Sequence, residues 1–496
     1  MTREQLLVTA GVMAGIAVAA LDSTVVGTAM PTIIGQLGGI DQYGWVFAAY
    51  LLTATTTVPV FSTLADVHGR KPIFLIGLAM FVGGSMLCGV SQSMLQLIIF
   101  RAVQGLGAGA VTPIAFTIIG DIFGPRERAR MQGLFSSVWG VSAIIGPALG
   151  GLITATVGWR WAFYINVPVG LAAALLIGLA LTEHVQHRQH RLDWLGTVTL
   201  TGGVALLLLG VSEGSRIGFA NATVVGMLAG AAILLLVFAR NETRAAEPLI
   251  DIDLLRKPII AAGLAIGTLA GVVMFGLTAY LPPVVQGVHG GSPLEAGLAV
   301  GAMSIGWPIG SIIAGRAMLR FGSRPVVVVG TGLLVVGSAL LTQAAPIQPL
   351  WYSALGAAVV GFGMGLVSTP LLVSIQTVVS WNKRGQATGL VQFSRTIGGA
   401  VGTGLMGAIL ASAVGAQASA ILDPVSRGSI APAELGTIRD SLAGGLGLIF
   451  VILLLTSAAA WLLAIRFMPA IHVDDVSEQA PEPVKAPAAM GKATYK

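Results

Sequence analysis

The sequence predicts an all-α membrane protein in which two six-helix bundles flank two inserted helices. Three observations favour this fold class. First, 55% of the 496 residues are hydrophobic and 10% are charged, with a mean hydropathy of +0.87, whereas a soluble protein carries about 25% charged residues. Second, the apolar residues form fourteen long runs. Third, the first six runs are weakly repeated in the last six. This composition excludes a soluble enzyme and a disordered chain.

Each run is long enough to cross a bilayer as a helix, for which about 20 mostly apolar residues are needed. The runs cover residues 6–33, 44–65, 73–90, 94–118, 131–155, 160–182, 194–212, 221–239, 258–284, 295–317, 325–344, 350–376, 386–412 and 443–467. The first run continues beyond the apolar core of a signal peptide. We therefore expect it to be retained as the first of fourteen transmembrane helices.

The basic residues predict the orientation of these helices. With a cytoplasmic N-terminus, 21 of the 27 basic residues lie on the cytoplasmic side, four lie outside, and Arg101 and Arg395 fall within spans. This asymmetry follows the positive-inside rule, so both termini are expected in the cytoplasm. Because the positive charge is spread over every cytoplasmic loop, the net charge of +6 does not indicate a nucleic-acid partner.

Weak internal repeats divide the chain into two halves. Residues 126–151 resemble residues 382–407, and the loop at 64–71 loosely resembles residues 315–324. Such repeats are typical of secondary transporters. The expected organisation is an N-terminal six-helix bundle (1–183), a two-helix insert with flanking cytoplasmic loops (184–257), a C-terminal six-helix bundle (258–469) and a disordered cytoplasmic tail (470–496).

Two charged residues inside spans are candidates for proton coupling. Asp22 is the only carboxylate placed deep within a run, and a buried acid in a membrane needs a partner or a water-filled cavity. Because burial favours the neutral form of a carboxyl group, Asp22 could carry a proton. Arg101 stays charged and could compete with the proton for Asp22. A permanent structural acid–arginine pair is the alternative.

A proline and three glycines in the fifth span are candidates for a conformational switch. Pro147 removes one helix hydrogen bond and bends the helix. Gly146, Gly150 and Gly151 allow a neighbouring backbone to approach closely. Ordinary close packing of helices is the alternative.

The loop between the second and third spans offers a second candidate switch. Asp66 and Arg70, on either side of Gly69, could pair with cytoplasmic helix ends. An acid near a helix N-terminus is stabilised by the helix dipole. A simple positive-inside turn explains the same residues equally well.

Aromatic side chains within the spans are candidates for an apolar substrate cavity. Arg395 lies in the thirteenth span with no acidic residue obvious nearby, so a substrate carboxylate, a backbone carbonyl or water could be its partner. The aromatic candidates are Trp45, Tyr50, Phe275, Tyr280, Trp307 and Phe393. Helix packing and lipid contact are the alternative roles for each of them.

No enzyme, metal or cofactor site is predicted. The chain has no HExxH pair, no GxSxG elbow and no paired carboxylates within spans. His184, His187 and His190 recur at a spacing of three, but a solvated basic loop explains this pattern better than a metal site. We expect no cofactor.

Two of the segments described above resemble signatures of the fourteen-span drug:proton antiporter family within the major facilitator superfamily. LDSTVVGTAMPTI (21–33) resembles the first-span signature, with Asp22 at the position of its acid. RAVQGLGAGA (101–110) fully matches the fourth-span motif, with Arg101 at the position of its arginine.

Two further segments support the resemblance, although each differs from the family motif at one or two positions. SAIIGPALGG (142–151) matches the antiporter motif except that Ser142 replaces a Gly. STLADVHGRK (62–71) matches the loop motif less well, since Ser62 and Val67 replace a Gly and an Arg. The chain resembles this family from about residue 6 to 467, and the two-span insert selects the fourteen-span branch.

The resemblance implies alternating access between the two halves, driven by the proton gradient without a cofactor. Protonation of Asp22 would release the substrate outward, and Arg101 would tune this exchange. The expected partners are a small hydrophobic substrate, protons and the lipid bilayer, and the protein is expected to be a monomer. The expected location is the bacterial inner (plasma) membrane.

Other functions remain open at this point. A single buried acid can balance one cation or carry one proton, which favours export of lipophilic, neutral or monovalent cationic drugs, dyes or biocides. An exporter of a lipid or another endogenous hydrophobic metabolite also fits the apolar cavity residues. A nutrient symporter and a non-transporting membrane sensor are the remaining alternatives.

Overall fold

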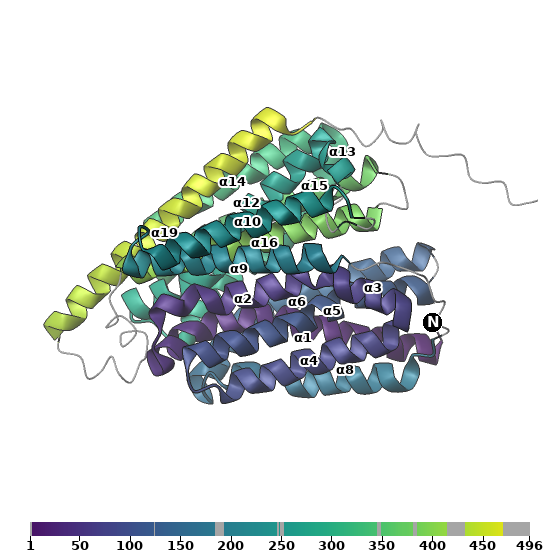
Figure 1. Ribbon diagram of the computed structural model, residues 1–496, viewed down its shortest axis with the longest axis horizontal. Coiled ribbons are helices and arrows are strands. Elements are labelled where there is room, and N and C mark those ends of the chain that lie inside the picture. Colours follow the sequence, from purple (N-terminus) through teal and green to yellow (C-terminus); the bar gives the residue numbers. More distant parts are fainter. Residues whose placement is uncertain are drawn as a thin grey trace, which may run out of the picture.

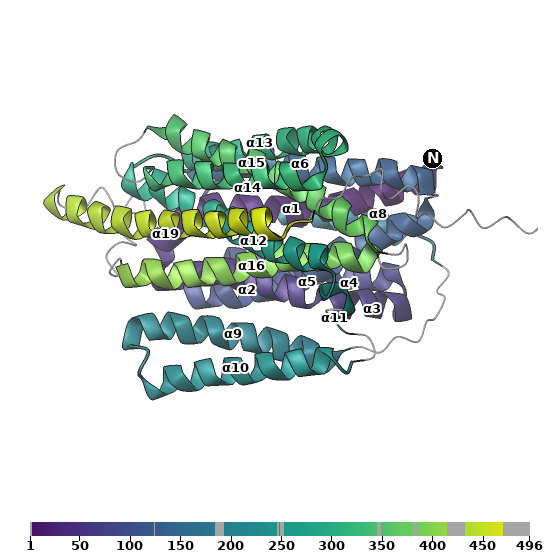
Figure 2. The same cartoon turned by 90° about the horizontal axis from the view of Figure 1, so that it is seen from above.

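The computed structural model describes residues 2–123, 125–183, 193–245, 248, 252–344, 349–379, 384–413 and 432–469. These residues form helices joined by short connections, with no β-strand among them (Figures 1 and 2). The all-α prediction is confirmed.

The helices before the insert pack on one another and are called the N half. They are α1 (Arg3–Leu37), α2 (Tyr43–Thr56), α3 (Val58–His68), α4 (Arg70–Val90), α5 (Met94–Ile122), α6 (Pro125–Thr156), α7 (Trp161–Tyr164) and α8 (Asn166–Ala180), with a short 3-10 helix η1 (Ile40–Gln42). The helix α1 lies against α5, α6 and α8, and α4 lies against α5 and α8. The helix α1 is therefore at the centre of this half.

The helices after the insert pack in the same way and are called the C half. They are α12 (Pro258–Pro283), the π-helical η2 (Val284–Val288), α13 (Pro293–Phe321), α14 (Ser323–Thr342), α15 (Leu350–Thr377), α16 (Arg384–Ala413) and α19 (Pro432–Phe467), preceded by the short α11 (Ile252–Leu255). In this half α12 contacts α15, α16 and α19, so its position corresponds to that of α1 in the N half.

Twelve helices of the described chain are long and apolar enough to cross a membrane, against fourteen predicted. The run 44–65 is broken into α2 and α3 at Thr57, two residues before Pro59, which cannot donate a helix hydrogen bond. In α6 (Pro125–Thr156), the apolar stretch Gly140–Thr156 covers only the part of the helix in which most side chains are described. For these two segments, a complete crossing of the membrane remains a prediction.

The two halves meet mainly where α2 packs on α16 and α6 packs on α13, with further contacts of α1 with α12 and α13 and of η1 with α16. Hydrogen bonds join the halves at the end of the molecule where α1 finishes. The Tyr43 hydroxyl donates to the Ala279 carbonyl oxygen. The Gln286 Nε2 donates to the Thr28 carbonyl oxygen at 3.0 Å. This end of the interface is therefore tightly closed.

The inserted helices α9 (Trp194–Ile217) and α10 (Ala222–Glu242) form a pair on one side of the bundle (Figure 2). The helix α9 contacts α2 of the N half and α16 of the C half, whereas α10 packs on α9. Leu200, Val204 and Leu208 of α9 belong to a buried cluster with Ala48 and Leu52 of α2. The insert thus covers the outer face of the α2–α16 contact.

Candidate functional site

Asp22 and Arg101 form an ion pair inside the N half. Asp22 lies near the middle of α1, Arg101 lies two turns into α5, and the Arg101 Nη1 is 2.5 Å from the Asp22 Oδ2. Both residues are buried, with 0% and 1% of their surfaces exposed. The close pairing compensates two charges that would each be costly to bury alone.

Two amide side chains complete the coordination of the Asp22 carboxylate. The other carboxylate oxygen, Oδ1, accepts hydrogen bonds from Gln104 Nε2 at 2.8 Å and from Asn166 Nδ2 at 2.9 Å. Both amides also donate to the Ser85 hydroxyl, which in turn donates to the Phe163 carbonyl oxygen. Because these groups donate rather than accept at Asp22, the arrangement fits an ionised carboxylate.

The arginine side of the pair faces Tyr50 of α2. The Arg101 guanidinium lies 4.0 Å from the centroid of the Tyr50 ring, a cation–π contact. Tyr50 also belongs to a buried cluster with Ala400 of α16 and, at its edge, Phe275 of α12. Tyr50 therefore contacts the charge pair and belongs to a cluster that includes residues of the C half.

The two charged residues are conspicuous in the sequence, whereas the neutral polar residues around them were not predicted from it. Gln104 lies three residues after Arg101, on the same helix face, and donates to Asp22 as well as accepting from Arg101 at 2.7 Å. Asn166 begins α8 and is 1% exposed. The only available signal was the presence of amide side chains within otherwise apolar runs.

Arg395 of α16 is in a different situation from Arg101. Its Nη2 donates to the Gln392 Oε1 at 2.5 Å, and its guanidinium lies 5.3 Å from the centroid of the Trp307 ring. Its Nε is buried, and no described residue forms a hydrogen bond with it. In the part of the chain that the structure describes, no carboxylate pairs with Arg395. Among the described residues, its positive charge therefore has no counter-charge.

The seven predicted cavity residues fall into separate places rather than one group. Tyr50 and Phe275 share the cluster beside Arg101. Trp45 and Phe393 pack in the cluster under the inserted helix α9. Tyr280 is fully buried, and its hydroxyl donates to the Thr403 carbonyl oxygen at 2.6 Å. Trp307 and Arg395 contact each other in the C half.

The proline and glycines of α6 lie at contacts with two other helices. The Thr24 hydroxyl of α1 donates to the Ser142 carbonyl oxygen at 3.3 Å, and Gly146 and Gly150 leave room for Thr24 and Thr28 of α1. The backbones of Pro147 and Gly151 lie against Gly297 and Pro293 of α13. This segment therefore contacts α1 within its own half and α13 across the interface.

The loop between α3 and α4 is tied to the end of α8. Gly69 has a φ of +98°, which favours glycine and ends α3. The backbone N–H groups of Arg70 and Lys71 donate to the Glu183 carboxylate at 2.7 and 2.9 Å. Glu183 thus accepts from the orphan donors at the start of α4. The Asp66 side chain lies outside the described residues.

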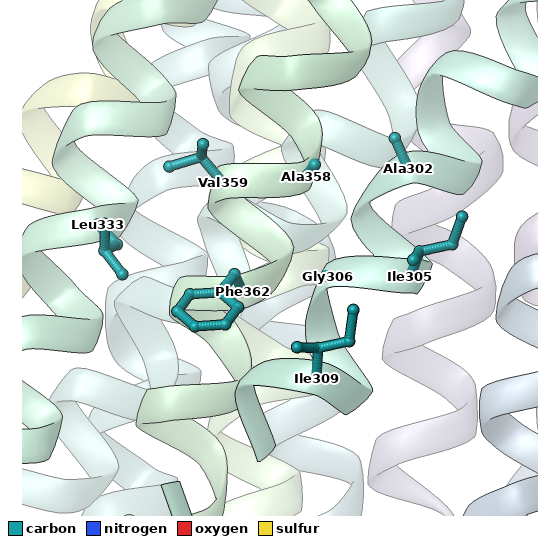
Figure 3. A pocket seen from close by; sticks show the side chains of 8 residues that line it. All are labelled: Ala302, Ile305, Gly306, Ile309, Leu333, Ala358, Val359 and Phe362. Atoms are coloured by element: carbon teal, nitrogen blue, oxygen red, sulfur yellow. The ribbon is translucent and has the colours of Figure 1, made fainter. Parts of the chain in front are cut away.

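An apolar groove with a volume of about 410 Å³ lies on the outside of the C half (Figure 3). It is lined by Ala302, Ile305, Gly306, Ile309, Leu333, Ala358, Val359 and Phe362. None of the predicted cavity residues belongs to it. Ile305 and Ile309 are half exposed, as expected of side chains that face lipid.

The part of the chain that the structure describes holds no group of three or more residues suited to a metal ion. His184, His187 and His190 lie outside the described residues.

The two packed halves, their apolar helices and the buried charge pair define a polytopic membrane protein with a two-bundle fold. A family model described as the Major Facilitator Superfamily matches residues 12–403. The chain belongs to this superfamily of transporters, which confirms the fold class and the family predicted from the sequence motifs.

Relatives with curated descriptions are named as drug transporters. The chain is 36% identical to the multidrug transporter protein MdtP of Bacillus subtilis (strain 168), over 82% of this chain and 76% of the relative. It is 32% identical to multidrug resistance protein 3 of the same organism, over 94% and 96% of the two chains. It is 31% identical to the drug efflux pump JefA of Mycobacterium tuberculosis (strain ATCC 25618 / H37Rv), over 86% and 85%.

Solved structures share the fold at low sequence identity. A bacterial homologue of the human lysosomal transporter Spinster, in an inward-facing and unoccupied conformation, superposes with a TM-score of 0.67 at 16% identity, covering 94% of this chain and 98% of that chain. A POT family peptide transporter superposes with a TM-score of 0.63 at 14% identity, over 95% and 98%. These similarities establish the fold alone.

Proposed function

We propose that the protein exports lipophilic drug-like compounds across the inner (plasma) membrane in exchange for protons, with both termini in the cytoplasm. The observation that carries the proposal is the buried Asp22–Arg101 pair, whose guanidinium contacts Tyr50, a member of a cluster that spans both halves. The names of the relatives support drugs as substrates. The positive-inside pattern of the sequence supports the orientation.

The geometry suggests how a proton would act on the fold. In the described state, three N–H donors converge on the Asp22 carboxylate. A proton on Asp22 would remove the counter-charge of Arg101 and weaken the link between α1 and α5. Because α1 also contacts α6 and α12, a change in its packing would reach the interface between the halves.

Proton entry can supply the work that such a change requires. One elementary charge crossing 100 mV releases about 2.3 kcal/mol, and each unit of pH difference adds about 1.4 kcal/mol. Opening a buried ion pair costs about 3–5 kcal/mol when one partner is lost. The energy released by proton entry is therefore similar to the cost of opening the ion pair. Protonation of one carboxylate is then sufficient to shift the equilibrium between two conformations.

The end of the interface near Gly151 and Gly44 is closed in the described state. With the N-terminus in the cytoplasm, this is the extracellular end. The substrate would then enter from the cytoplasm or the inner leaflet, and protonation of Asp22 in the outward-open state would release it. The cycle needs no cofactor.

The test is Asp22→Asn, which keeps the shape of the side chain and removes its titration. We expect pH-gradient-driven export from proteoliposomes to be abolished. The protein should still insert into the membrane, but its melting temperature should fall, because Arg101 stays buried without its counter-charge. Asp41→Asn is the matched control, because Asp41 is an exposed acid in η1. Undiminished export by Asp22→Asn under an imposed pH gradient would refute proton coupling through this residue.

A further inference from the structure

We infer that Arg395, together with Gln392 and Trp307, binds an anionic group of the exported compound. The inference rests on the proposed export function and narrows its substrates to aromatic amphiphiles that carry a carboxylate or a similar anion. The sequence pattern favoured neutral or monovalent cationic compounds. The structure points to anionic compounds instead. Arg101 of the N half is paired with a carboxylate, whereas Arg395 of the C half has no carboxylate partner among the described residues.

Trp307 faces the interior of the C half. On α13, Ile305 and Ile309 are 52% and 49% exposed and line the outer groove of Figure 3. Residue 307 is two positions from each of them, which places it about 160° away around the helix. Trp307 is partly buried against the main hydrophobic cluster. Its ring therefore lies on the side of α13 opposite to lipid.

The Arg395 side chain extends from α16, past α12, toward α13. The Arg395 backbone packs directly on Gly271 of α12, and its guanidinium meets the Trp307 ring of α13 at 5.3 Å. The helix α12 contacts both α13 and α16. The Arg395 side chain therefore extends across the face of α12, between two helices that take part in the interface with the N half.

Polar side chains beside Arg395 show that this surface is not in contact with lipid. Gln392 is exposed and Thr396 is partly exposed, although both lie within a membrane-spanning stretch of α16. Exposed polar groups at membrane depth face a water-filled cavity or a partner. Gln392 accepts a hydrogen bond from the Arg395 Nη2. The Arg395 Nε has no hydrogen-bond partner among the residues that the structure describes.

The charges of the interior favour an anion over a cation. Asp22 is fully buried, paired with Arg101 and hydrogen-bonded by two amides, so a cationic ligand finds no free carboxylate there. Arg395 supplies an uncompensated positive charge. A guanidinium binds a carboxylate through two parallel hydrogen bonds, and the adjacent indole ring offers an apolar face for an aromatic ligand.

The experiment compares three fluorescent probes that share one aromatic core: 1-pyrenebutanoate, its methyl ester and 1-pyrenebutylamine. Equilibrium binding to the purified full chain is measured by fluorescence anisotropy without any gradient. We expect the carboxylate to bind more tightly than the ester or the amine, and Arg395→Gln to weaken carboxylate binding about tenfold or more. Arg395→Lys should retain part of the preference, because it keeps the charge but loses the fork geometry.

Arg160→Gln is the matched control, since Arg160 also lies over a tryptophan, at 4.4 Å from the Trp159 ring, but on the connection before α7. It should leave all three affinities within about twofold. Equal weakening of the three probes by a folded Arg395→Gln variant would overturn the inference, as would unchanged carboxylate binding. Thermal melting in detergent verifies that each variant is folded.

The same probes separate this inference from the proposed function. If the protein prefers the carboxylate through Arg395 but drives no export under a pH gradient in proteoliposomes, the binding site stands and the antiport proposal fails. If a gradient drives export of the amine or the ester while Arg395→Gln leaves carboxylate binding unchanged, the antiport proposal stands and the anionic subsite is refuted.

Discussion

The two halves of the protein place charge inside the membrane in opposite ways. In the N half, Arg101 has a carboxylate at 2.5 Å and an aromatic ring over its guanidinium, and two further amides bind the carboxylate. In the C half, Arg395 has one amide oxygen and one indole ring, and no carboxylate among the described residues. One half thus holds a closed charge network, and the other presents a free charge.

This difference assigns different tasks to the two halves. A proton that binds the carboxylate removes one charge of a compensated pair, which has a large energetic effect, so such a pair suits energy coupling. An uncompensated arginine gains from any anion that can reach it, so it suits recognition. Substitutions in the N half network should therefore mainly lower stability, whereas substitutions at Arg395 should mainly change which ligands bind.

The largest expected effect is the loss of stability in Arg101→Leu. This change leaves Asp22 buried without a counter-charge, which costs about 3–5 kcal/mol. Arg395→Leu removes a charge with no ionic partner and should change stability by about 1 kcal/mol or less. Thermal melting of the purified proteins, in the same detergent, measures both.

A double variant separates lost charge compensation from lost packing. Asp22→Asn combined with Arg101→Leu removes both charges, so it should recover most of the melting temperature lost in Arg101→Leu alone. Equal losses in Arg101→Leu and Arg395→Leu, or no recovery in the double variant, would contradict the contrast between the halves.

Much of this contrast could be predicted from the sequence because charge is so rare within the spans. Asp22, Arg101 and Arg395 are conspicuous in runs of apolar residues, and the superfamily predicted from the motifs around the first two is confirmed by the family match. The helical fold follows equally directly from the length and composition of the runs.

The partners of the charges could not be predicted in the same way. Asn166 and Ser85 reach Asp22 and its neighbours from α8 and α4, and their convergence depends on how those helices are rotated and packed. A neutral amide in a span is too common to indicate such a role. The break between α2 and α3 was missed because Pro59 is as apolar as its surroundings.

The aromatic residues show a further limit of the sequence. Trp45, Tyr280 and Trp307 have the same character in an apolar run, yet one packs under α9, one is fully buried in the core and one meets Arg395. Hydropathy does not distinguish lipid, core and cavity within a membrane, because all three surroundings accept aromatic side chains.

The next largest effect is expected where the halves touch. In Gly44→Ala, the new Cβ would overlap the Thr403 carbonyl oxygen of α16, and such overpacking costs about 1–3 kcal/mol. Because each transport cycle must pass through the state closed at this end, we expect export in proteoliposomes to fall about tenfold. The melting temperature should fall much less than in Arg101→Leu.

Gly83→Ala provides the control for a glycine within the N half. A Cβ at Gly83 meets nothing within 4 Å, so this variant should export at the parent rate. A normal export rate for Gly44→Ala would contradict this prediction. It would show that the α2–α16 contact adjusts to the new methyl group at little cost, and that closure at this end does not limit the transport rate.

The smallest effect is expected at the α3–α4 loop of the N half. There the Glu183 carboxylate accepts hydrogen bonds from the N–H groups at the start of α4. Glu183→Gln retains an acceptor for the Arg70 N–H but removes the negative charge at the start of α4. A charge at a helix N-terminus contributes about 0.3–1 kcal/mol. Hydrogen exchange of the first-turn amides of α4 should therefore accelerate about two- to fivefold.

Glu295→Gln is the comparable change in the C half, because Glu295 caps α13 together with Ser292. It should accelerate exchange only at the start of α13 and leave α4 unchanged. If Glu183→Gln leaves α4 protected but slows export, Glu183 acts on the conformational cycle rather than as a cap. The charge compensation of the N half would then include a second switch at its surface, separate from the buried pair.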